Sequence, residues 1–473
     1  MEEKNESKNI ISLTENINNS NNYNSRMIKN NQDEAEELQI ISEEQNNQIN
    51  FKKEMDYTND KKKTYFPSLT INKEFDFKYD TPLKQILPVG LKNLGKSCFM
   101  NSCLQCFYHC SQFTSEILDN YQKYENMKCP VLLCYLEVLK NLYTNGKESS
   151  KRKIISLREN NENEYESTYC CCRKRRVNNN EVNYCRNETN PASAKELYLY
   201  ILKNYSNLTH KNGSDPKIVA EMILSAMNRE IDSNFKYIRD KEIPKSNEAL
   251  LFNHIFNYYK NNKTVVSSNF YWIKESISIC NECGKETYNF QSDYIFYFYP
   301  EAIINGLNLK IDNNKYKLSL ENCFEYFHTS GQLDINSFTC KLCNKRVKAK
   351  SILDYMATLP KYLVLCLCND KDVVNPINYT FDYNKEINLE KYYRKHPQNN
   401  YSTKYKFHCG CYSTSNYFHM VAFCVHFDGL IYEFNDSFYK ENNFLNSSEK
   451  DTWDKPYLLI YKRDDHSSIN ISK

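Results

Sequence analysis

Long apolar runs are missing from the sequence. The longest, Tyr362 to Cys368, has the length of a β-strand, whereas a helix that crosses a membrane needs ~20 apolar residues. The start of the chain, Met1 to Ser20, is polar and acidic, and no basic segment is followed by an apolar one, so we expect no signal peptide. Both absences predict a protein of the cytoplasm or the nucleus, with no membrane as a partner.

An excess of charge of either sign is also missing. The chain of 473 residues has 62 Lys and Arg against 59 Asp and Glu, which gives a net charge of +3. A balance this close offers no bulk attraction to nucleic acid or to an anionic membrane. The 20 cysteines do not indicate a disulfide framework, because the chain is long and the predicted compartment is reducing. We therefore expect their thiols to be free, metal-bound or catalytic.

Apolar residues are scarce in two parts of the chain. Residues 1–80 are rich in Asn, Lys and Glu and cannot bury enough apolar area to offset chain entropy, which predicts a disordered N-terminal segment. Residues 145–190 form a polar insertion, whose basic run Arg173–Arg176 we interpret as a solvated loop rather than a nuclear-localisation signal. The remainder, residues 88–463, has ample material for a core, and residues 464–473 form a short tail.

The hydrophobic pattern changes from helical to strand-like along the folded part. In residues 98–143, Met100, Cys103, Leu104 and Phe107 recur with the period of a helix. Further helical patterns cover residues 131–142, 192–204 and 216–231. From about residue 267, short aromatic and β-branched runs alternate with turn residues, at 269–279, 294–299, 362–368, 417–427 and 457–461. Helices first and strands afterwards predict an α+β fold rather than alternating βαβ units.

Cys98 lies between a glycine-containing loop and an amphipathic helix. Ser97 suits the N-cap of that helix, which puts Cys98 at the first helical position, where unbonded N–H groups and the helix dipole favour a thiolate. Asn93, on the loop, has an amide placed to reach an oxyanion beside the N–H of Cys98. These features predict a catalytic nucleophile, and the alternative is one more small buried hydrophobic residue.

A thiolate mechanism needs a general base and a group that holds the tautomer of that base. His419 lies on a strand pattern that continues through the hairpin signal Asp428-Gly429 to Asn435. We expect His419 to be the base, with His408 and His426 as competing candidates. The alternative for His419 is a satisfied structural histidine on a strand.

The length of the hairpin loop decides which faces His419 and Asn435 take. A two-residue loop places their side chains on opposite faces of the sheet. A three-residue loop, Phe427 to Gly429 with the glycine left-handed, places Asn435 opposite Val421 and on the face of His419. The chemistry therefore predicts the three-residue loop.

Two pairs of cysteines have the spacing of metal-binding knuckles, Cys280 with Cys283 and Cys340 with Cys343. Four thiolates suit a tetrahedral Zn²⁺ ion of structural type, with no open position for catalysis. The long segment between the pairs, residues 284–339, means that strands must bring them together. The alternatives are two unrelated pairs of reduced cysteines or, for the basic run at 345–350, a nucleic-acid contact.

The segment Gly90–Gln105 resembles the cysteine box of the ubiquitin-specific protease family. It departs at Lys96, where the family usually has Asn, and at Ser97, where it usually has Thr. The two cysteine pairs resemble the zinc-bearing fingers of the same family. Of the family's Gln-Gln-Asp-Ala-x-Glu-Phe-Leu segment, only Glu221 matches well.

The segment around His419 resembles the histidine box of that family. Here Phe418, Met420 and Ile431 stand in place of Gly, Tyr and Trp. By this likeness Asn435 orients the base, and the next residue, Asp436, is an auxiliary.

The resemblance implies a papain-like fold with a helical thumb (about 90–265), a β-rich palm and fingers (about 267–355) that hold zinc. It implies hydrolysis of the bond after the C-terminal glycine of ubiquitin, with Cys98 as the nucleophile. Ubiquitin and ubiquitinated proteins are then the partners, the need for an activating protein stays open, and zinc is structural. Three alternatives remain: a protease for a ubiquitin-like modifier, a catalytically weak ubiquitin-binding scaffold, and a zinc-dependent interaction module.

Overall fold

The structure, a computed structural model, describes residues 77–127, 129–160, 172–177, 180–185, 189–204, 215–232, 248–261, 263–312, 314–329, 338–340, 343, 345–347, 349–368, 378–382, 384–397, 401–413, 419–442 and 456–465. All of these residues belong to the compact unit Phe66–Lys473. The predictions for the disordered segment 1–80 and the tail 464–473 lie almost wholly outside the described residues. No helix among the described residues has both the length and the apolar character of a membrane span.

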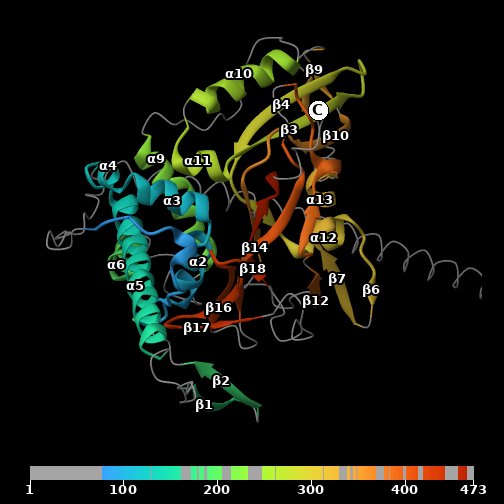
Figure 1. The fold of residues 1–473 in the computed structure, drawn as a ribbon. Coiled ribbons are helices and arrows are strands. Elements are labelled where there is room, and N and C mark those ends of the chain that lie inside the picture. The colour runs from blue at the N-terminus through green and yellow to red at the C-terminus, as the bar shows by residue number, and fades with distance from the viewer. Residues whose placement is uncertain are drawn as a thin grey trace, which may run out of the picture. The chain divides into compact units, whose positions relative to one another are not determined.

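Helices dominate the first part of this unit (Figure 1). They are η1 (Leu83–Gln85), α2 (Cys98–Tyr108), α3 (Ser111–Asp119), α4 (Tyr121–Glu125), α5 (Pro130–Asn160), α6 (Lys195–Asn204), α8 (Pro216–Glu221), η2 (Met222–Ala226), α9 (Met227–Ile231), α10 (Glu248–Asn261), α11 (Val265–Phe270), α12 (Pro300–Gly306), α13 (Leu320–Thr329) and η4 (Glu390–Tyr392). The helices expected within 98–143, 192–204 and 216–231 are confirmed, and the last contains a π-helical turn, η2.

Local signals in the sequence explain where two of these helices begin. At α8, Asp215 accepts a hydrogen bond from the backbone of Lys217 at 2.9 Å, and Pro216 takes the first helical position. At α11, Thr264 and Ser267 form a reciprocal capping box. Because of this helix, the strand expected from residue 269 begins only at Trp272.

Strands dominate the rest of the unit, which confirms the α+β class. They are β1 (Cys172–Val177), β2 (Asn180–Cys185), β3 (Trp272–Cys280), β4 (Glu286–Asp293), β5 (Phe296–Phe298), β6 (Ile311–Asp312), β7 (Lys315–Ser319), β8 (Phe338–Cys340), β9 (Lys345–Val347), β10 (Ala349–Met356), β11 (Tyr362–Leu367), β12 (Tyr379–Asp382), β13 (Glu386–Asn388), β14 (Lys404–Ser413), β15 (Met420–Val425), β16 (Ile431–Asn435), β17 (Phe438–Glu441) and β18 (Pro456–Arg463).

A central eight-stranded sheet organises the unit. Its path is β17-β16-β15-β14-β18-β11-β5, with β13 paired to β14 beside this path. Only β5 and β11 run parallel to each other within it. Helices α2, α3, α5 and α6 lie on one side of the sheet and α12 and α13 on the other (Figure 1). Separate ladders are formed by β10-β3-β4, β12-β7-β6, β8-β9 and β1-β2.

The solvated-loop interpretation of Arg173–Arg176 is wrong. These residues lie in β1, which pairs antiparallel with β2 from Cys172 opposite Cys185 to Val177 opposite Asn180. The start of the insertion also differs from expectation, because α5 continues to Asn160. A strand ladder satisfies backbone groups without needing apolar side chains, so composition alone does not reveal it.

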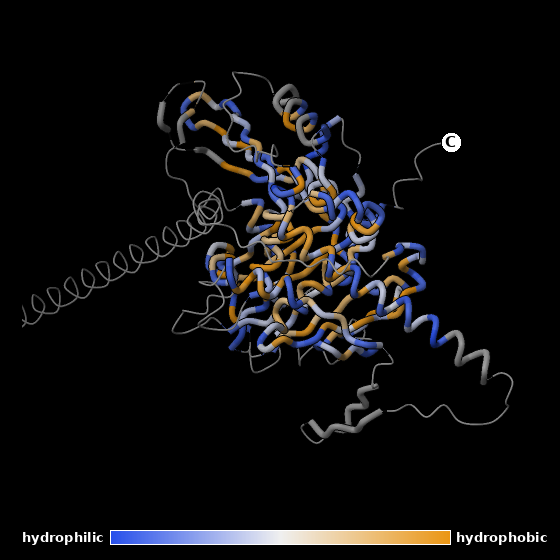
Figure 2. Tube along the Cα trace, turned by 90° about the vertical axis from the view of Figure 1, so that its left-hand side faces the viewer, coloured by the Kyte–Doolittle hydropathy of each residue, from blue (hydrophilic) through white to orange (hydrophobic). Residues whose placement is uncertain are grey.

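The core explains the apolar run at Tyr362–Leu367. All six residues of β11 are buried. Val364 packs into the apolar cluster on the helical side of the sheet, whereas Leu365 packs into the cluster on the opposite side. A strand covered on both faces reads as a continuous apolar run instead of an alternating one. Figure 2 shows the same arrangement, with apolar segments gathered in the interior and hydrophilic ones around them.

We expect the substitution Leu365→Ala to lower the free energy of unfolding by about 2–5 kcal/mol, because it removes buried methyl groups and leaves a cavity. Leu365 is 1 % exposed. Urea unfolding followed by fluorescence measures the change. The matched control is Ile311→Ala, since Ile311 is 59 % exposed and its loss is expected to cost less than about 0.5 kcal/mol. Equal losses in the two variants would contradict this account of the core.

Candidate active site

Cys98 is the first residue of α2 and is partly exposed. Ser97 takes the N-cap position, but its hydroxyl does not cap the helix. Its Oγ instead accepts a hydrogen bond from the backbone of Leu94 at 2.9 Å, which closes the loop before the helix. No side chain among the described residues therefore caps the first amides of α2. The N–H groups of these amides remain available to a negative charge beside Cys98.

Two left-handed residues shape the loop before Cys98. Gly95 has φ of +85° and Lys96 has φ of +58°. Asn tolerates this conformation better than Lys, which gives a physical meaning to the Asn that the family usually has at this position. The loop is held by a hydrogen bond from the Gly95 amide to Asn93 Oδ1 at 2.9 Å and by one from the Tyr198 hydroxyl to the Gly95 carbonyl at 2.7 Å.

His419 and Asn435 lie together as the hairpin analysis predicts. The Asn435 Oδ1 atom is 2.8 Å from His419 Nε2. The predicted three-residue loop is confirmed: the His426 amide donates to the Leu430 carbonyl at 2.8 Å, and Gly429 is left-handed with φ of +90°. The register that pairs Ala422 with Phe434 carries through to Val421 and Asn435.

Asp436 links the hairpin to the loop that precedes Cys98. Its Oδ2 accepts a hydrogen bond from Asn93 Nδ2 at 2.8 Å, and its Oδ1 accepts one from Asn101 Nδ2 at 2.8 Å. Its backbone carbonyl accepts a third, from the Leu91 amide at 2.8 Å. Asn101 was not among the predicted site residues, although it lies inside the segment that resembles the cysteine box.

This contact requires a glycine at position 90. A Cβ atom added there would lie 2.5 Å from the carbonyl carbon of Ser437, closer than carbon atoms approach without a bond. Asp436 itself is left-handed, with φ of +50°. The backbone of the hairpin end therefore packs directly against the backbone of the cysteine loop.

The charge balance of the site centres on His419. A hydrogen bond with Cys98 raises the pKa of His419, burial opposes this shift, and Asn435 and Asp436 add to it, giving about 9. The Asp436 Oδ2 atom lies 3.9 Å from His419 Nε2. At neutral pH the ring is therefore expected to hold its extra proton and to lie beside Cys98 as a cation.

The two competing histidines have structural positions. His408 is buried, its Nε2 lies 2.7 Å from the His109 carbonyl, and burial lowers its pKa to about 4. His426 is buried between His109 Nε2 at 2.9 Å and the Ile86 carbonyl at 2.8 Å. Both rings are engaged away from Cys98. Phe418, the departure beside the base, lies outside the described residues.

The four predicted metal ligands converge at the end of β3. The sulfur atoms of Cys280, Cys283, Cys340 and Cys343 all lie within 4.8 Å of one another. The Cys280–Cys343 and Cys283–Cys340 sulfur pairs are both 3.8 Å apart. Tetrahedral coordination with metal–sulfur bonds of ~2.3 Å requires sulfurs about 3.8 Å apart, so the group can hold a metal ion.

The first knuckle has the backbone that its turn requires. Gly284 is left-handed, with φ of +66°, and its amide donates to the Cys280 carbonyl at 2.9 Å. The Cys283 amide points at the Cys280 sulfur at 3.5 Å, and the second knuckle repeats this contact between Cys343 and Cys340 at 3.4 Å. Amides directed at sulfur stabilise thiolates and orient them for a metal.

Glu221, the one residue that matches the family's degenerate segment, is buried in α8. The Tyr297 hydroxyl donates a hydrogen bond to its Oε1, and burial raises the pKa of Tyr297. Lys217, one turn earlier, lies with Nζ 4.6 Å from the centre of the Tyr297 ring.

A helix that presents a thiol to an imidazole on a facing β-hairpin, within an α+β fold, is the arrangement typical of cysteine hydrolases of papain-like architecture. Residues 89–461 match the family described as ubiquitin carboxyl-terminal hydrolase. The chain belongs to this family.

The chain is similar to several relatives. It is 24 % identical to probable ubiquitin carboxyl-terminal hydrolase 4 of Schizosaccharomyces pombe over 293 residues, which cover 59 % of this chain and 41 % of that protein. It is 25 % identical to ubiquitin carboxyl-terminal hydrolase 8 of Saccharomyces cerevisiae over 390 residues, which cover 79 % of this chain and 70 % of that protein. The chain thus spans less than half the length of the first of these relatives.

The fold is also that of a solved structure, the SAGA Ubp8/Sgf11/Sus1/Sgf73 DUB module bound to ubiquitin aldehyde. The TM-score is 0.51 at 18 % identity, and the match covers 83 % of this chain and 72 % of that chain. A second structure of the module, with a substituted Ubp8 bound to monoubiquitin, has the same TM-score of 0.51. These matches confirm the papain-like fold expected from the sequence.

We expect Cys98→Ala to lower the pKa of His419 from about 9, because the hydrogen bond with Cys98 is the largest cause of the raised value. Because the folded-state pKa is raised, the stability that this proton contributes is present below the unfolded value near ~6.5 and is lost as the pH rises through about 9.

Histidine carbon NMR across a pH titration measures this change, with the His419 signal assigned from His419→Gln. Cys103→Ala is the matched control, since Cys103 is a fully buried cysteine on the same helix. An unchanged His419 titration in Cys98→Ala would mean that the two side chains do not share a proton.

Proposed function

We propose that this protein removes ubiquitin from other proteins by thiol-dependent hydrolysis of the bond after ubiquitin's C-terminal glycine. The observation that carries the proposal is the contact of Cys98, His419 and Asn435 within a domain of the ubiquitin carboxyl-terminal hydrolase family. Ubiquitin and ubiquitinated proteins are the proposed partners.

The proposed first half-reaction is acyl transfer to sulfur. The Cys98 thiolate attacks the carbonyl carbon of the terminal glycine, and the carbonyl oxygen takes up the negative charge. Collapse of this tetrahedral intermediate breaks the bond to the lysine nitrogen. His419 gives its extra proton to that nitrogen, so that a neutral amine leaves and a thioester remains on Cys98.

The second half-reaction restores the enzyme. The neutral His419 takes a proton from water, and the resulting hydroxide adds to the thioester carbonyl. Collapse then breaks the carbon–sulfur bond and releases the ubiquitin carboxylate. Asn435, whose Oδ1 lies 2.8 Å from His419 Nε2, keeps the ring oriented so that Nδ1 remains the nitrogen available to Cys98.

The oxyanion has two proposed donors, the backbone N–H of Cys98 and the Asn93 side chain. The Nδ2 atom of Asn93 carries two hydrogens, and the bond to Asp436 uses one of them. The second hydrogen is free to reach the oxyanion, and the bond to Asp436 fixes the plane of the amide in advance. Asp436 is therefore proposed as a positioning residue for both the donor and the base.

We also propose that the four-cysteine group holds Zn²⁺. The equal sulfur separations of 3.8 Å and the two matching knuckles support this metal. Zinc bound there would brace β3, β8 and the segments between them, and it would have no part in the chemistry at Cys98. A cytoplasmic or nuclear location stays a prediction, and the need for an activating partner stays open.

The expected result with a ubiquitin probe that carries a C-terminal electrophile is one covalent adduct per chain. Cys98→Ala is expected to abolish the adduct, and Asn435→Ala to slow its formation by about tenfold or more. Cys106→Ala, a buried cysteine further along α2, is the control that should leave labelling intact. Mass spectrometry of the intact protein measures the adduct in the parent chain and in the three variants.

The same experiment separates the alternatives. Labelling only by the probe of another modifier would assign the enzyme to that modifier. Binding of ubiquitin without an adduct in the intact chain would define a scaffold and overturn the proposal.

We expect one equivalent of zinc per chain after purification without added metal. The double variant Cys280→Ser/Cys340→Ser should lose it and unfold at lower temperature, because a structural zinc site contributes folding free energy. Cys323→Ala, a buried cysteine of α13, should keep the metal. Elemental analysis measures the zinc content, and thermal unfolding measures the unfolding temperature. A parent chain that is metal-free yet fully active would contradict the assignment of a structural zinc site.

A further inference from the structure

A second pocket lies away from the Cys98 site, where α10, α11 and β3 meet the ends of β11 and β18. Its volume is about 220 Å³. Arg463, at its rim, pairs with Tyr405 at one end of β14, whereas Ser413 pairs with Met420, next to His419, at the other end. At ~3.3 Å per residue, the span from 405 to 413 places the pocket roughly 25 Å from the catalytic histidine.

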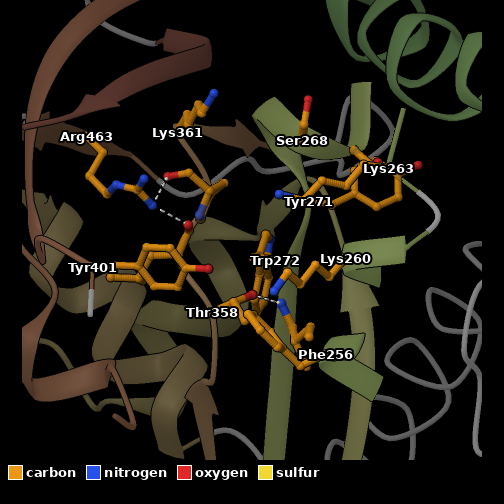
Figure 3. A pocket seen from close by; sticks show the side chains of 14 residues that line it. Phe256, Lys260, Lys263, Ser268, Tyr271, Trp272, Thr358, Lys361, Tyr401 and Arg463 are labelled. Carbon is orange, nitrogen blue, oxygen red and sulfur yellow. Dashed lines mark hydrogen bonds between the residues drawn. The ribbon is translucent and has the colours of Figure 1, made fainter. Parts of the chain in front are cut away.

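The lining of this pocket carries four cations and no acidic side chain: Lys260, Lys263, Lys361 and Arg463 (Figure 3). Two of the cations have acidic partners outside the lining. Arg463 bonds to Asp465 at 2.6 Å, and Lys361 lies 3.9 Å from Glu116. Lys260 and Lys263 have no ion-pair partner among the described residues, so the pocket has excess positive charge.

Lys361 is influenced by two of the other cations of the pocket. Burial lowers the pKa of Lys361, Glu116 opposes this shift, and the charges of Arg463 and Lys263 add to it. Like charges that lie near one another repel, and an anion placed between them relieves this repulsion. Lys260 and Lys263 are exposed, so an anion can reach both of them from solvent. The free amines of Lys260 and Lys263 are the groups that an anion would engage.

Aromatic rings form the walls between these cations. Figure 3 shows Phe256, Tyr271, Trp272 and Tyr401 around the hollow. The guanidinium of Arg463 lies 4.7 Å from the centre of the Tyr401 ring, which fixes one wall. Flat apolar walls suit a planar ring, and the lysines suit an attached anion.

We propose that this pocket binds a small organic phosphate, in which a phosphate monoester is attached to a planar ring. The phosphate engages Lys260 and Lys263, and the ring packs against the aromatic walls. The volume of about 220 Å³ lies below the ~300–1,000 Å³ of pockets that enclose drug-sized ligands, so it suits a single planar ring with its phosphate and is too small for a folded domain. A free nucleotide and a phosphorylated tyrosine side chain share this chemistry.

Calorimetric titration and thermal unfolding of the full chain test the proposal with four probes: AMP, phenyl phosphate, inorganic phosphate and adenosine. We expect AMP or phenyl phosphate to bind saturably and to raise the unfolding temperature, with at least tenfold weaker binding of inorganic phosphate and adenosine. Tighter binding of AMP points to a nucleotide, and tighter binding of phenyl phosphate points to a phosphotyrosine side chain.

Two double variants show where the probe binds. Lys260→Ala/Lys263→Ala should lose at least tenfold in affinity. Lys84→Ala/Lys310→Ala removes the same charge from exposed positions outside the pocket and should bind as the parent does. Equal losses in the two variants, or no saturable binding of either ring-bearing phosphate at millimolar concentration, would overturn the proposal. Neither variant touches the Cys98 site, so ubiquitin-probe labelling tests the proposed hydrolase separately.

Discussion

The carboxylate of Asp436 is the contact on which the geometry of the active site depends. It accepts hydrogen bonds from Asn93 and Asn101, which are 343 and 335 residues away in sequence. One side chain thus ties the loop before Cys98 and the first turn of α2 to the hairpin that carries His419. Both bonds are 2.8 Å long, and a charged acceptor makes each of them stronger than a bond between neutral groups.

The sheet and the helix supply the rigidity that this contact needs. His419 and Asn435 belong to neighbouring segments of one hairpin, so their relative position is set by strand register. Helix α2 packs against β15 of the same hairpin, and this packing fixes the position of Cys98 relative to the hairpin. The remaining freedom lies in the loop from Gly90 to Ser97, and Asp436, Tyr198 and the Ser97 hydroxyl each hold one part of it.

The sequence predicts the parts of the site that depend on local chemistry. The register of the hairpin followed from one requirement, that His419 and Asn435 share a face, and the observed loop at Gly429 satisfies it. The convergence of two distant cysteine pairs followed from the coordination that a metal demands. The role of Asn101 did not follow, because a buried amide on a helix has no local pattern and its partner lies at the far end of the chain.

The hairpin of β1 and β2 is a second feature that local sequence patterns did not predict. Its basic residues resemble a solvated loop in composition, and only the pairing of backbone groups makes them a strand. The left-handed backbone at Asp436 belongs to the two-residue turn that joins Asn435 to its partner Phe438. The close approach of this turn to Gly90 is, by contrast, a tertiary contact that no local pattern signals. Composition and periodicity report burial, whereas these features depend on which segments meet.

The proposed chemistry uses one sulfur atom in a chain with 20 cysteines. Burial raises the pKa of Cys103, Cys110, Cys366 and Cys424, which keeps them as neutral thiols within the core. Cys409 is an exception: burial raises its pKa, but hydrogen bonds from the thiols of Cys106 and Cys424 bring it down to about 6. It is fully buried and out of reach of any substrate.

Three conditions therefore act together at Cys98. The sulfur is at a helix start, it forms a hydrogen bond with His419, and it is partly exposed. Cys409 has a lowered pKa, but its burial leaves it without access to a substrate. Exposure alone, as at Cys283, gives access without a base, and the neighbouring thiols there favour a metal instead. The proposal of Cys98 as the nucleophile thus depends on a helix start, a base and surface exposure occurring together, and the contact of Asp436 holds the helix and the base next to each other.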